Sequence, residues 1–259
     1  MCRWAAYIGQ PTLLGDIISH PEHSLIAQSQ HATQSTFTTN ADGFGVAWYG
    51  ASDLPGVFRD IHPAWSDRNL RSLADHVSSN LFISHIRAST ASPTSRENCH
   101  PFTAGRWSFV HNGQLGDFPK FRHEADTGIL PEHYAYREGS TDSEALFLTA
   151  LGEGIDDDPK GALERASGKL ETLSRAKGTA PYLHMSVAFS CGKKLYVARY
   201  ASDGNDPTVY HRWSPELQGH AVVSEPLNLK SGWEEVPPGS FCVFDGKSVD
   251  IQPFSPVGG

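Results

Sequence analysis

Short apolar runs predict two blocks of β-strands, one in the first half of the chain and one near its end. The runs are rich in apolar, β-branched and aromatic residues and have the length of buried strands. The first block comprises residues 2–8, 43–49, 81–86 and 107–110. The second block comprises residues 185–189, 194–199, 209–212, 221–224, 240–244 and 248–253.

Between the two blocks, apolar residues recur at helical spacing. Thr141 and Glu144 have the spacing of a capping box, which predicts that a helix begins here. Residues 159–177 predict a second helix directly after it. Strands in two blocks, separated by consecutive helices, are typical of two antiparallel sheets packed together with helices outside, and not of alternating parallel βαβ units. The pattern therefore predicts an α+β fold.

Weaker signals predict smaller elements and a long loop. Residues 12–19 and 67–77 predict short helices, the second with Ser66 as its N-cap. Residues 117–139 are polar, aromatic and irregular, so we expect a loop that covers a site. Because no repeat, linker or change of composition divides the sequence, residues 1–259 are expected to form a single domain.

Charge and composition narrow the classes of function. The net charge of −8 leaves no basic stripe, which disfavours a nucleic-acid partner or binding to an anionic membrane. No apolar run reaches the length of a membrane-spanning helix, and the first residues lack the apolar stretch of a signal peptide. We therefore expect a cytoplasmic protein that acts on a small molecule.

One of the four cysteines is distinguished by its position. Cys2 becomes the first residue once Met1 is removed, and a free α-amine, with a pKa of about 7.7–8.0, can then accept the proton of the thiol. The alternative is an ordinary strand residue. Cys99, Cys191 and Cys242 are widely spaced and form no CxxC motif, so neither a zinc site nor a disulfide framework is predicted.

Asn112 and Gly113 could complete such a nucleophilic site. They follow a predicted strand, and the Asn112 side-chain amide with the Gly113 backbone N–H could stabilise the oxyanion of a tetrahedral intermediate. The alternative is a hairpin, because Asn-Gly is a favoured turn dipeptide and, taken alone, indicates a turn more often than a catalytic site.

Two charged residues could hold the amino-acid end of a glutamine-like substrate. Arg87 ends a predicted strand and could bind an α-carboxylate with two parallel hydrogen bonds. Asp142, in the first turn of a helix, could bind an α-ammonium group. The alternatives are a structural ion pair for Arg87 and a helix-capping charge for Asp142.

A metal hydrolase is a third class to consider, because the chain has 13 histidines. Their spacing matches no standard metal site, and no HExxH motif is present. We therefore expect neither a metal nor another cofactor. The histidines weighed as ligands are His20, His23, His85, His100 and His111.

Six short motifs together resemble one known family. MCRWAAYIG, NADGFGVAWY, SHIRAST, NCHPF, HNG and STDSE occur in the order found in class II glutamine amidotransferases, across most of the chain. The resemblance implies a four-layer αββα sandwich of the N-terminal-nucleophile hydrolase type, with Cys2 as nucleophile. It also implies that Asn112 and Gly113 form the oxyanion hole, and that Arg87 and Asp142 hold the substrate.

The resemblance further implies that Thr90 and His100 line or support the pocket, although His100 could equally be a structural histidine. Better-known members carry a synthase domain and often have Trp after the arginine, where this chain has Ala88. The motifs look closer to a standalone subgroup that includes γ-glutamyl hydrolases of the ergothioneine pathway and an amidotransferase-like subunit of glutathione degradation.

We therefore expect hydrolysis of a γ-glutamyl amide, either glutamine or a γ-glutamyl amine or peptide, through a thioester on Cys2. Two alternatives remain. The chain could be a glutaminase subunit that delivers ammonia to a separate synthase partner, or a partner subunit without catalytic activity. A homo-oligomer is compatible with each of these interpretations.

Overall fold

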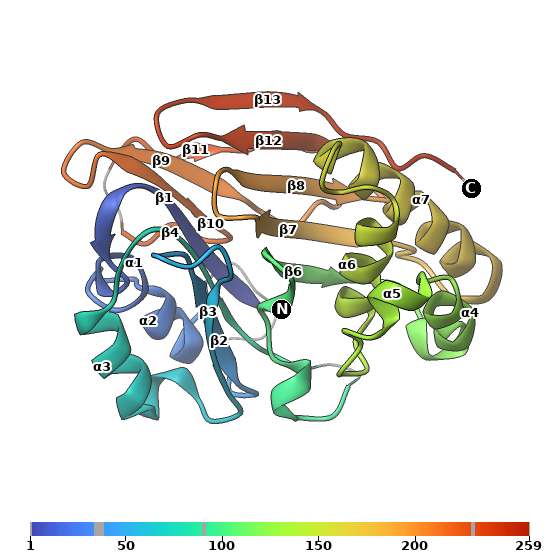
Figure 1. Cartoon of the computed structure of the whole chain (residues 1–259), viewed down its shortest axis with the longest axis horizontal. Coiled ribbons are helices and arrows are strands. Elements are labelled where there is room, and N and C mark those ends of the chain that lie inside the picture. Colours follow the sequence, from blue (N-terminus) through green and yellow to red (C-terminus); the bar gives the residue numbers. More distant parts are fainter. Residues whose placement is uncertain (1, 34–38, 90–91, 229–230, 259) are drawn as a thin grey trace.

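The chain folds into two antiparallel sheets that pack face to face (Figure 1). The computed structural model describes residues 2–33, 39–89, 92–228 and 231–258. The first sheet has the order β11-β9-β10-β1-β4-β2-β3, and the second has the order β13-β12-β8-β7-β6-β5. The strands are β1 (Arg3–Leu13), β2 (Phe44–Trp48), β3 (Gly56–Asp60), β4 (Ser78–Ile86), β5 (Phe102–Ala104), β6 (Trp107–Gln114), β7 (His184–Ser190), β8 (Leu195–Ala201), β9 (Tyr210–Ser214), β10 (Gly219–Val223), β11 (Glu234–Glu235), β12 (Ser240–Phe244) and β13 (Val249–Pro253).

Helices cover the outer faces of both sheets (Figure 1). On the first sheet lie α1 (Gly15–Ile18), α2 (Leu25–Gln30) and α3 (Arg68–His76). On the second lie α4 (Arg122–Thr127), α5 (Pro131–Tyr134), α6 (Asp142–Gly152) and α7 (Pro159–Lys177). Three short 3₁₀ helices complete the described elements: η1 (Ala64–Ser66), η2 (Arg96–Asn98) and η3 (Phe118–Lys120). No described helix is both long and apolar enough to cross a membrane.

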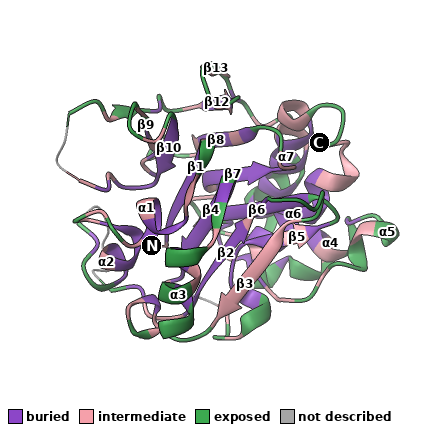
Figure 2. Ribbon diagram, turned by 60° about the vertical axis from the view of Figure 1, so that its left-hand side comes forward, coloured by how far each residue is buried: buried purple, intermediate pink, exposed green. Residues whose placement is uncertain are grey.

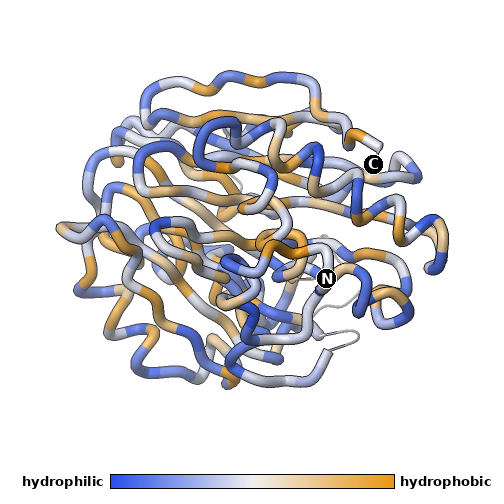
Figure 3. The backbone as a smooth tube through the Cα atoms, turned by 45° about the vertical axis from the view of Figure 1, so that its right-hand side comes forward, coloured by the Kyte–Doolittle hydropathy of each residue, from blue (hydrophilic) through white to orange (hydrophobic). Residues whose placement is uncertain are grey.

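Three apolar clusters correspond to the three interfaces between four layers. One cluster joins α1–α3 to the first sheet, one fills the space between the sheets, and one joins the second sheet to α4–α7. Figure 2 shows the buried strands at the centre, and Figure 3 shows apolar stretches along them with mostly hydrophilic outer turns. The predicted αββα sandwich is thus confirmed.

Strand β1 lies in the middle of the first sheet and contributes to two of these interfaces. Ala5 and Tyr7 face the helices, whereas Trp4, Ala6 and Ile8 face the second sheet, as expected from the alternation of side chains along a strand. It pairs with β10 on one side and β4 on the other. This register places the beginning of β1 beside the end of β4.

The structure corrects several predicted elements. Residues 117–139 are not a continuous loop, because they contain η3, α4 and α5. The N-cap of α3 is Asp67 and not Ser66: the Asp67 carboxylate accepts the Leu70 N–H at 2.7 Å. Much of the helix expected at 12–19 is strand or turn, and only Gly15–Ile18 is helical.

Other boundaries agree closely. The helix over 159–177 and the strand over 240–244 are confirmed residue for residue. The short elements β3, β5, β11 and α2 were not predicted, because two to six residues carry too little periodicity to be recognised.

Candidate active site

Cys2 lies at the start of β1 and contacts the chain segment that follows β4. Its sulfur accepts the Ala88 N–H at 3.4 Å and lies 3.6 Å from the Ala88 carbonyl oxygen, to which the thiol can donate. Burial raises the pKa of the Cys2 thiol, and the Ala88 N–H and the Arg87 and Arg3 charges partly offset this rise. Cys2 is half-buried. The thiol therefore needs a base to become a thiolate.

Arg87 is buried under its own loop. Its Nη2 donates to the Ser92 hydroxyl at 2.7 Å and carbonyl at 3.1 Å, and to the Ser89 hydroxyl at 3.0 Å. Its Nη1 donates to the Asp42 carbonyl at 3.3 Å. Because no carboxylate pairs with Arg87 among the described residues, the structural ion pair considered above is wrong. The guanidinium instead organises the loop after β4.

The other residues of this loop are only partly described. Thr90, which the family resemblance implies is in the pocket, lies outside the described residues, as does Met1. Ser89 donates its N–H to the Asp42 carboxylate at 2.8 Å, and this bond ties the loop to the segment before β2.

Asn112 and Gly113 belong to strand β6 and not to a turn. They pair with Ser186 and Met185 of β7, so the hairpin-turn interpretation is wrong. Asn112 is 2% exposed, and no hydrogen bond to its side chain is found among the described residues. Its amide therefore remains free to bind a ligand.

Position 113 accommodates only glycine, because there is no space for a Cβ atom. A Cβ atom there would lie 2.0 Å from the His184 carbonyl oxygen and 2.3 Å from the His111 ring. The backbone of β6 thus approaches β7 and the His111 side chain more closely than any other residue would allow.

Trp4 connects the start of β1 to β7, the strand that pairs with β6. Its indole N–H donates to the Ser186 hydroxyl at 3.0 Å, and Ser186 lies directly opposite Asn112 in the β6–β7 register. Trp4 is only two residues beyond Cys2. Strand β1, which begins directly after Cys2, also contacts β6, which carries Asn112, 110 positions away in the sequence.

A hydrogen-bond network fixes Asp142 against β6. The Asp142 carboxylate accepts the Leu115 N–H and the Ser143 N–H, each at 2.8 Å. The ring of His111 bonds to the Ser143 hydroxyl at 2.9 Å and to the His184 carbonyl at 3.1 Å. Because the carbonyl can only accept, Nε2 carries the proton and Nδ1 accepts from Ser143. Burial lowers the pKa of His111, so the ring stays neutral.

A cavity of about 390 Å³ opens beside Gly113 and Asp142. Ser92, which Arg87 holds, forms another part of its wall. Phe118 also lines it, and the rest of the lining is 114–117, Pro119, Ser140, Thr141 and 179–181. The volume lies within the range of small-molecule sites, about 300–1,000 Å³.

His100 supports this region from inside without lining the cavity. Its ring stacks on His85 of β4 with 4.2 Å between the ring centroids and contacts Phe102. Burial holds the pKa of His85 at about 3 and that of His100 well below its ordinary value. Both rings are therefore neutral packing partners beneath Arg87.

The histidines weighed as metal ligands, all of which are described, do not form a group of three whose ligand atoms lie close together. His20 pairs with Asp16 and Asp75, and His23 pairs with Glu225. His85 and His100 stack, as described above, whereas His111 bonds to Ser143.

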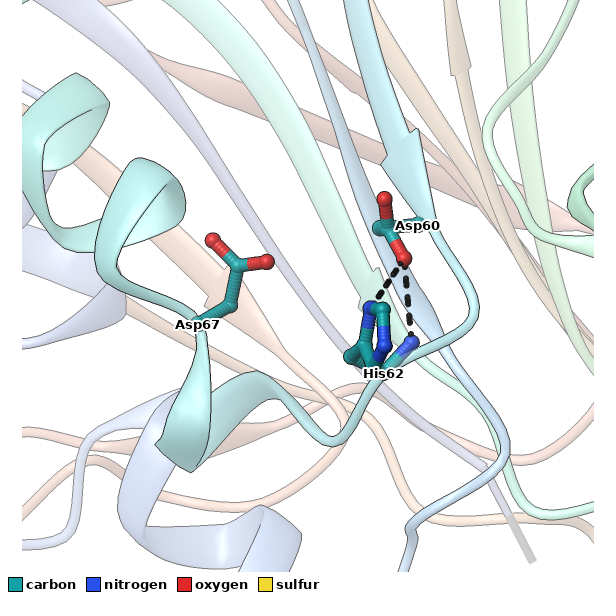
Figure 4. Close-up of side chains that lie close together, drawn as sticks. All are labelled: Asp60, His62 and Asp67. Carbon is teal, nitrogen blue, oxygen red and sulfur yellow. Dashed lines mark hydrogen bonds and ion pairs between the residues drawn. The ribbon is translucent and has the colours of Figure 1, made fainter.

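Asp60, His62 and Asp67 are the only group of three potential ligands found close together in the described part of the chain (Figure 4). Their ligand atoms all lie within 4.8 Å of one another. Asp60 already accepts from the His62 ring and backbone, and Asp67 caps α3. The group is therefore explained by local hydrogen bonding.

The sequence did not reveal which residues position the candidate site. Ser143 and His111, which link Asp142 to β6, are such residues, and both lie within the STDSE and HNG motifs. Arg3 and Ser186 are two further examples. The position of Arg3, directly after the candidate nucleophile in the sequence, could have indicated its role. Ser186 could be found only from the strand register.

The chain is similar in sequence to one protein family and to individual known proteins. The profile of glutamine amidotransferases class-II matches residues 13–203. The chain is 30% identical to the probable glutamine amidotransferase DUG3 of Saccharomyces cerevisiae, over 98% of this chain and 84% of that protein. It is 27% identical to the gamma-glutamyl-hercynylcysteine sulfoxide hydrolase of Mycolicibacterium smegmatis, over 92% of each.

A solved structure agrees with these relatives. The glutamine aminotransferase class-II domain protein from Silicibacter pomeroyi is 47% identical and superimposes with a TM-score of 0.80, over 98% of this chain and 100% of that chain. The sequence comparisons and this structural comparison therefore indicate the same protein family.

Proposed function

Because this chain belongs to the class II glutamine amidotransferases, we propose that it hydrolyses a γ-glutamyl amide through a thioester on Cys2. One observation carries this proposal. Within the described residues, the Cys2 sulfur bonds only to the backbone of Ala88, so no side-chain base reaches it. The α-amine of Cys2 itself, free once Met1 is removed, is then the base that this thiol requires.

The first half of the reaction forms the thioester. The α-amine takes the thiol proton, the sulfur adds to the amide carbon, and the carbonyl electron pair moves onto oxygen. When this oxyanion collapses, the C–N bond breaks and the leaving amine takes the proton from the α-ammonium. In the second half, water adds to the thioester with the α-amine as base, and the release of glutamate restores the thiol.

Asn112 and Gly113 stabilise the oxyanion in this scheme. The Asn112 amide has no hydrogen-bond partner among the described residues, and the enforced glycine lets the backbone of β6 approach closely. Donors fixed in this way cost little reorganisation when the negative charge develops. The two donors come from one strand, so their separation is set by the backbone.

Asp142 and Arg87 hold the amino-acid end of the substrate. Asp142 lies on the cavity wall with its carboxylate held by two N–H groups, and it offers an anion to the α-ammonium. Arg87 lies behind Ser92, and we propose that an α-carboxylate replaces the loop oxygens as acceptor for its Nη2. His100 supports the same end of the pocket, and the role of Thr90, which lies outside the described residues, stays a prediction of the family resemblance.

We propose that the physiological substrate extends beyond glutamine. The relative from Mycolicibacterium smegmatis is named for a γ-glutamyl compound, and the cavity that Asp142 lines is also lined by Phe118, which can contact a larger substrate. Binding energy from a remote group can align the amide, so a substrate without that group loses kcat as well as affinity.

A substrate panel tests this proposal. Glutamine, γ-glutamyl peptides and glutathione are assayed with the purified chain, with detection of glutamate and of the released amine. We expect kcat/KM to be higher for an extended γ-glutamyl compound than for glutamine. If glutamine equals or exceeds all of them, or if turnover requires an added synthase, an ammonia-donating subunit is the better assignment.

The change Asn112→Ala is expected to lower kcat by about 10²–10³-fold with little change in KM, because it removes one oxyanion donor. Steady-state kinetics measure this, with urea unfolding in parallel. Ser108→Ala, at a buried position of the same strand, provides a control for damage to β6. An Asn112→Ala protein that is less stable but has wild-type kcat would assign Asn112 a purely structural role.

A further inference from the structure

A buried ion pair lies directly behind the candidate nucleophile. Arg3 Nε donates to the Glu225 carboxylate at 2.8 Å, and both side chains are only 1% exposed. The same guanidinium uses Nη1 to bind the carbonyl oxygen of Cys2 at 3.1 Å. One side chain therefore bridges a fixed anion and the peptide group of Cys2.

Glu225 is held in place from several sides. Its other carboxylate oxygen accepts from His23 Nε2 at 2.6 Å and from the Thr33 N–H at 2.9 Å. Its backbone carbonyl accepts from Gln28 at 3.2 Å. Burial alone would raise the pKa of Glu225, but the hydrogen bonds from Thr33 and His23 and the Arg3 charge hold it at about 2, so the carboxylate is charged at neutral pH.

The strand register brings Glu225 to Arg3. Ser224, the residue before it, exchanges hydrogen bonds with Trp4: the Ser224 N–H donates to the Trp4 carbonyl at 3.0 Å, and the Trp4 N–H donates to the Ser224 hydroxyl at 3.0 Å. Arg3, which directly precedes Trp4, and Glu225, which directly follows Ser224, are therefore fixed beside each other. The ion pair therefore follows from hydrogen bonding between β1 and the residues that come directly after β10.

This arrangement limits how Cys2 can be oriented. The Cα of Cys2 carries three heavy groups: the amide or amine nitrogen, the carbonyl, and the side chain that ends in sulfur. The Ala88 N–H holds the sulfur, and Arg3 holds the carbonyl. Because the Cα is tetrahedral, fixing two of these groups determines the direction of the third, which is the nitrogen.

We propose that Glu225 is a positioning residue for the nucleophile, acting through Arg3 to fix the Cys2 carbonyl and thereby the direction in which the α-amine and the thiol face the substrate. The role rests on the proposed function, since it matters only if Cys2 carries out the chemistry. A misplacement of about 1 Å at a reacting group can lower the rate by about 10²-fold.

An arginine is required at position 3 for a geometric reason. Nε and Nη1 belong to one rigid plane and donate to Glu225 and to Cys2 at the same time. A lysine keeps the positive charge but has a single nitrogen on a flexible chain. Arg3→Lys is therefore expected to keep the ion pair and the fold, but to lose the hydrogen bond that fixes the Cys2 carbonyl.

The experiment compares Arg3→Lys with the double variant Arg3→Met/Glu225→Leu. Replacing both partners of a buried pair by apolar residues is often neutral for stability, whereas Glu225→Gln alone leaves the Arg3 charge without a partner. We measure kcat, KM and the urea midpoint of each protein. Glu171→Leu on α7 is the control, because Glu171 is also a buried carboxylate bound to an arginine.

We expect both variants to keep KM within twofold of the wild-type value, with kcat lowered by about 10-fold in Arg3→Lys and about 100-fold in the double variant. Arg3→Lys should keep the wild-type urea midpoint, whereas the double variant should have a lower one, because His23 and the Thr33 N–H lose their acceptor. Glu171→Leu should keep the wild-type kcat. Wild-type kcat in Arg3→Lys, or in a stable double variant, would overturn the positioning role. If the double variant does not fold, the kcat of Arg3→Lys alone decides whether the positioning role holds. A wild-type protein without turnover on any γ-glutamyl amide would instead refute the proposed function.

Discussion

The substitution Cys2→Ala is expected to reduce turnover by roughly 10⁴–10⁶-fold while the protein stays folded, because loss of the nucleophile removes the covalent route altogether. Cys2 is half-buried at the start of β1, and its sulfur forms hydrogen bonds only with the Ala88 backbone among the described residues. Removing one sulfur atom therefore leaves the sheet pairing intact. Glutamate release measures activity, and circular dichroism with urea unfolding measures the fold.

Cys191→Ala is the matched control for this change. Cys191 is also half-buried, but it lies in the hairpin between β7 and β8, which is not part of the proposed site. Its replacement should leave kcat and KM as in the wild type. Activity above about one per cent in Cys2→Ala, beyond contamination by wild-type protein, would show that another group is the nucleophile.

Gly113→Ala is expected to have the second-largest effect, a loss of kcat/KM of at least about 10³-fold. The added Cβ would lie 2.0 Å from the His184 carbonyl oxygen and 2.3 Å from the His111 ring, so β6 must move away from β7. That movement displaces the Gly113 N–H and Asn112 together, and both are proposed oxyanion donors. Overpacking of this kind also costs about 1–3 kcal/mol of stability or more.

The control for this change is Gly50→Ala, where a Cβ meets no atom within 4 Å. It should leave both activity and the free energy of unfolding nearly unchanged. Activity is compared at a temperature where each variant is fully folded, as judged by its urea curve. A folded Gly113→Ala protein with wild-type kcat would contradict the proposed oxyanion role of this segment of β6.

The layered fold could be predicted because its signals are repeated along the chain. Many short apolar runs and the strongly patterned helix Pro159–Lys177 each indicate the same architecture. The six motifs then identified the family, and the capping signal at Thr141 placed Asp142 at the start of α6, where Thr141 accepts the Glu144 N–H at 3.2 Å. These features depend on local sequence.

Features that depend on tertiary packing could not be predicted. Asn112 and Gly113 have the local chemistry of a turn, but pairing with β7 keeps them extended. Residues 117–139 form short helices because Phe118 and Phe121 pack against the second sheet and its helices, which periodicity in a polar segment does not reveal. The pairing of Arg3 with Glu225 joins residues 222 positions apart.

The most direct test of the central claim, that Cys2 acts as an N-terminal nucleophile, is to label active protein with a glutamine-like diazo-ketone and locate the label by intact-mass and peptide mass spectrometry. We predict one label per chain, on a Cys2 that has lost Met1, together with complete loss of activity. Burial raises the pKa of Cys99 to about 11 and that of Cys242 to about 12, which keeps both thiols protonated and unreactive. Inactivation with the label on Cys99, Cys191 or Cys242, or full activity in protein that retains Met1, would contradict the account.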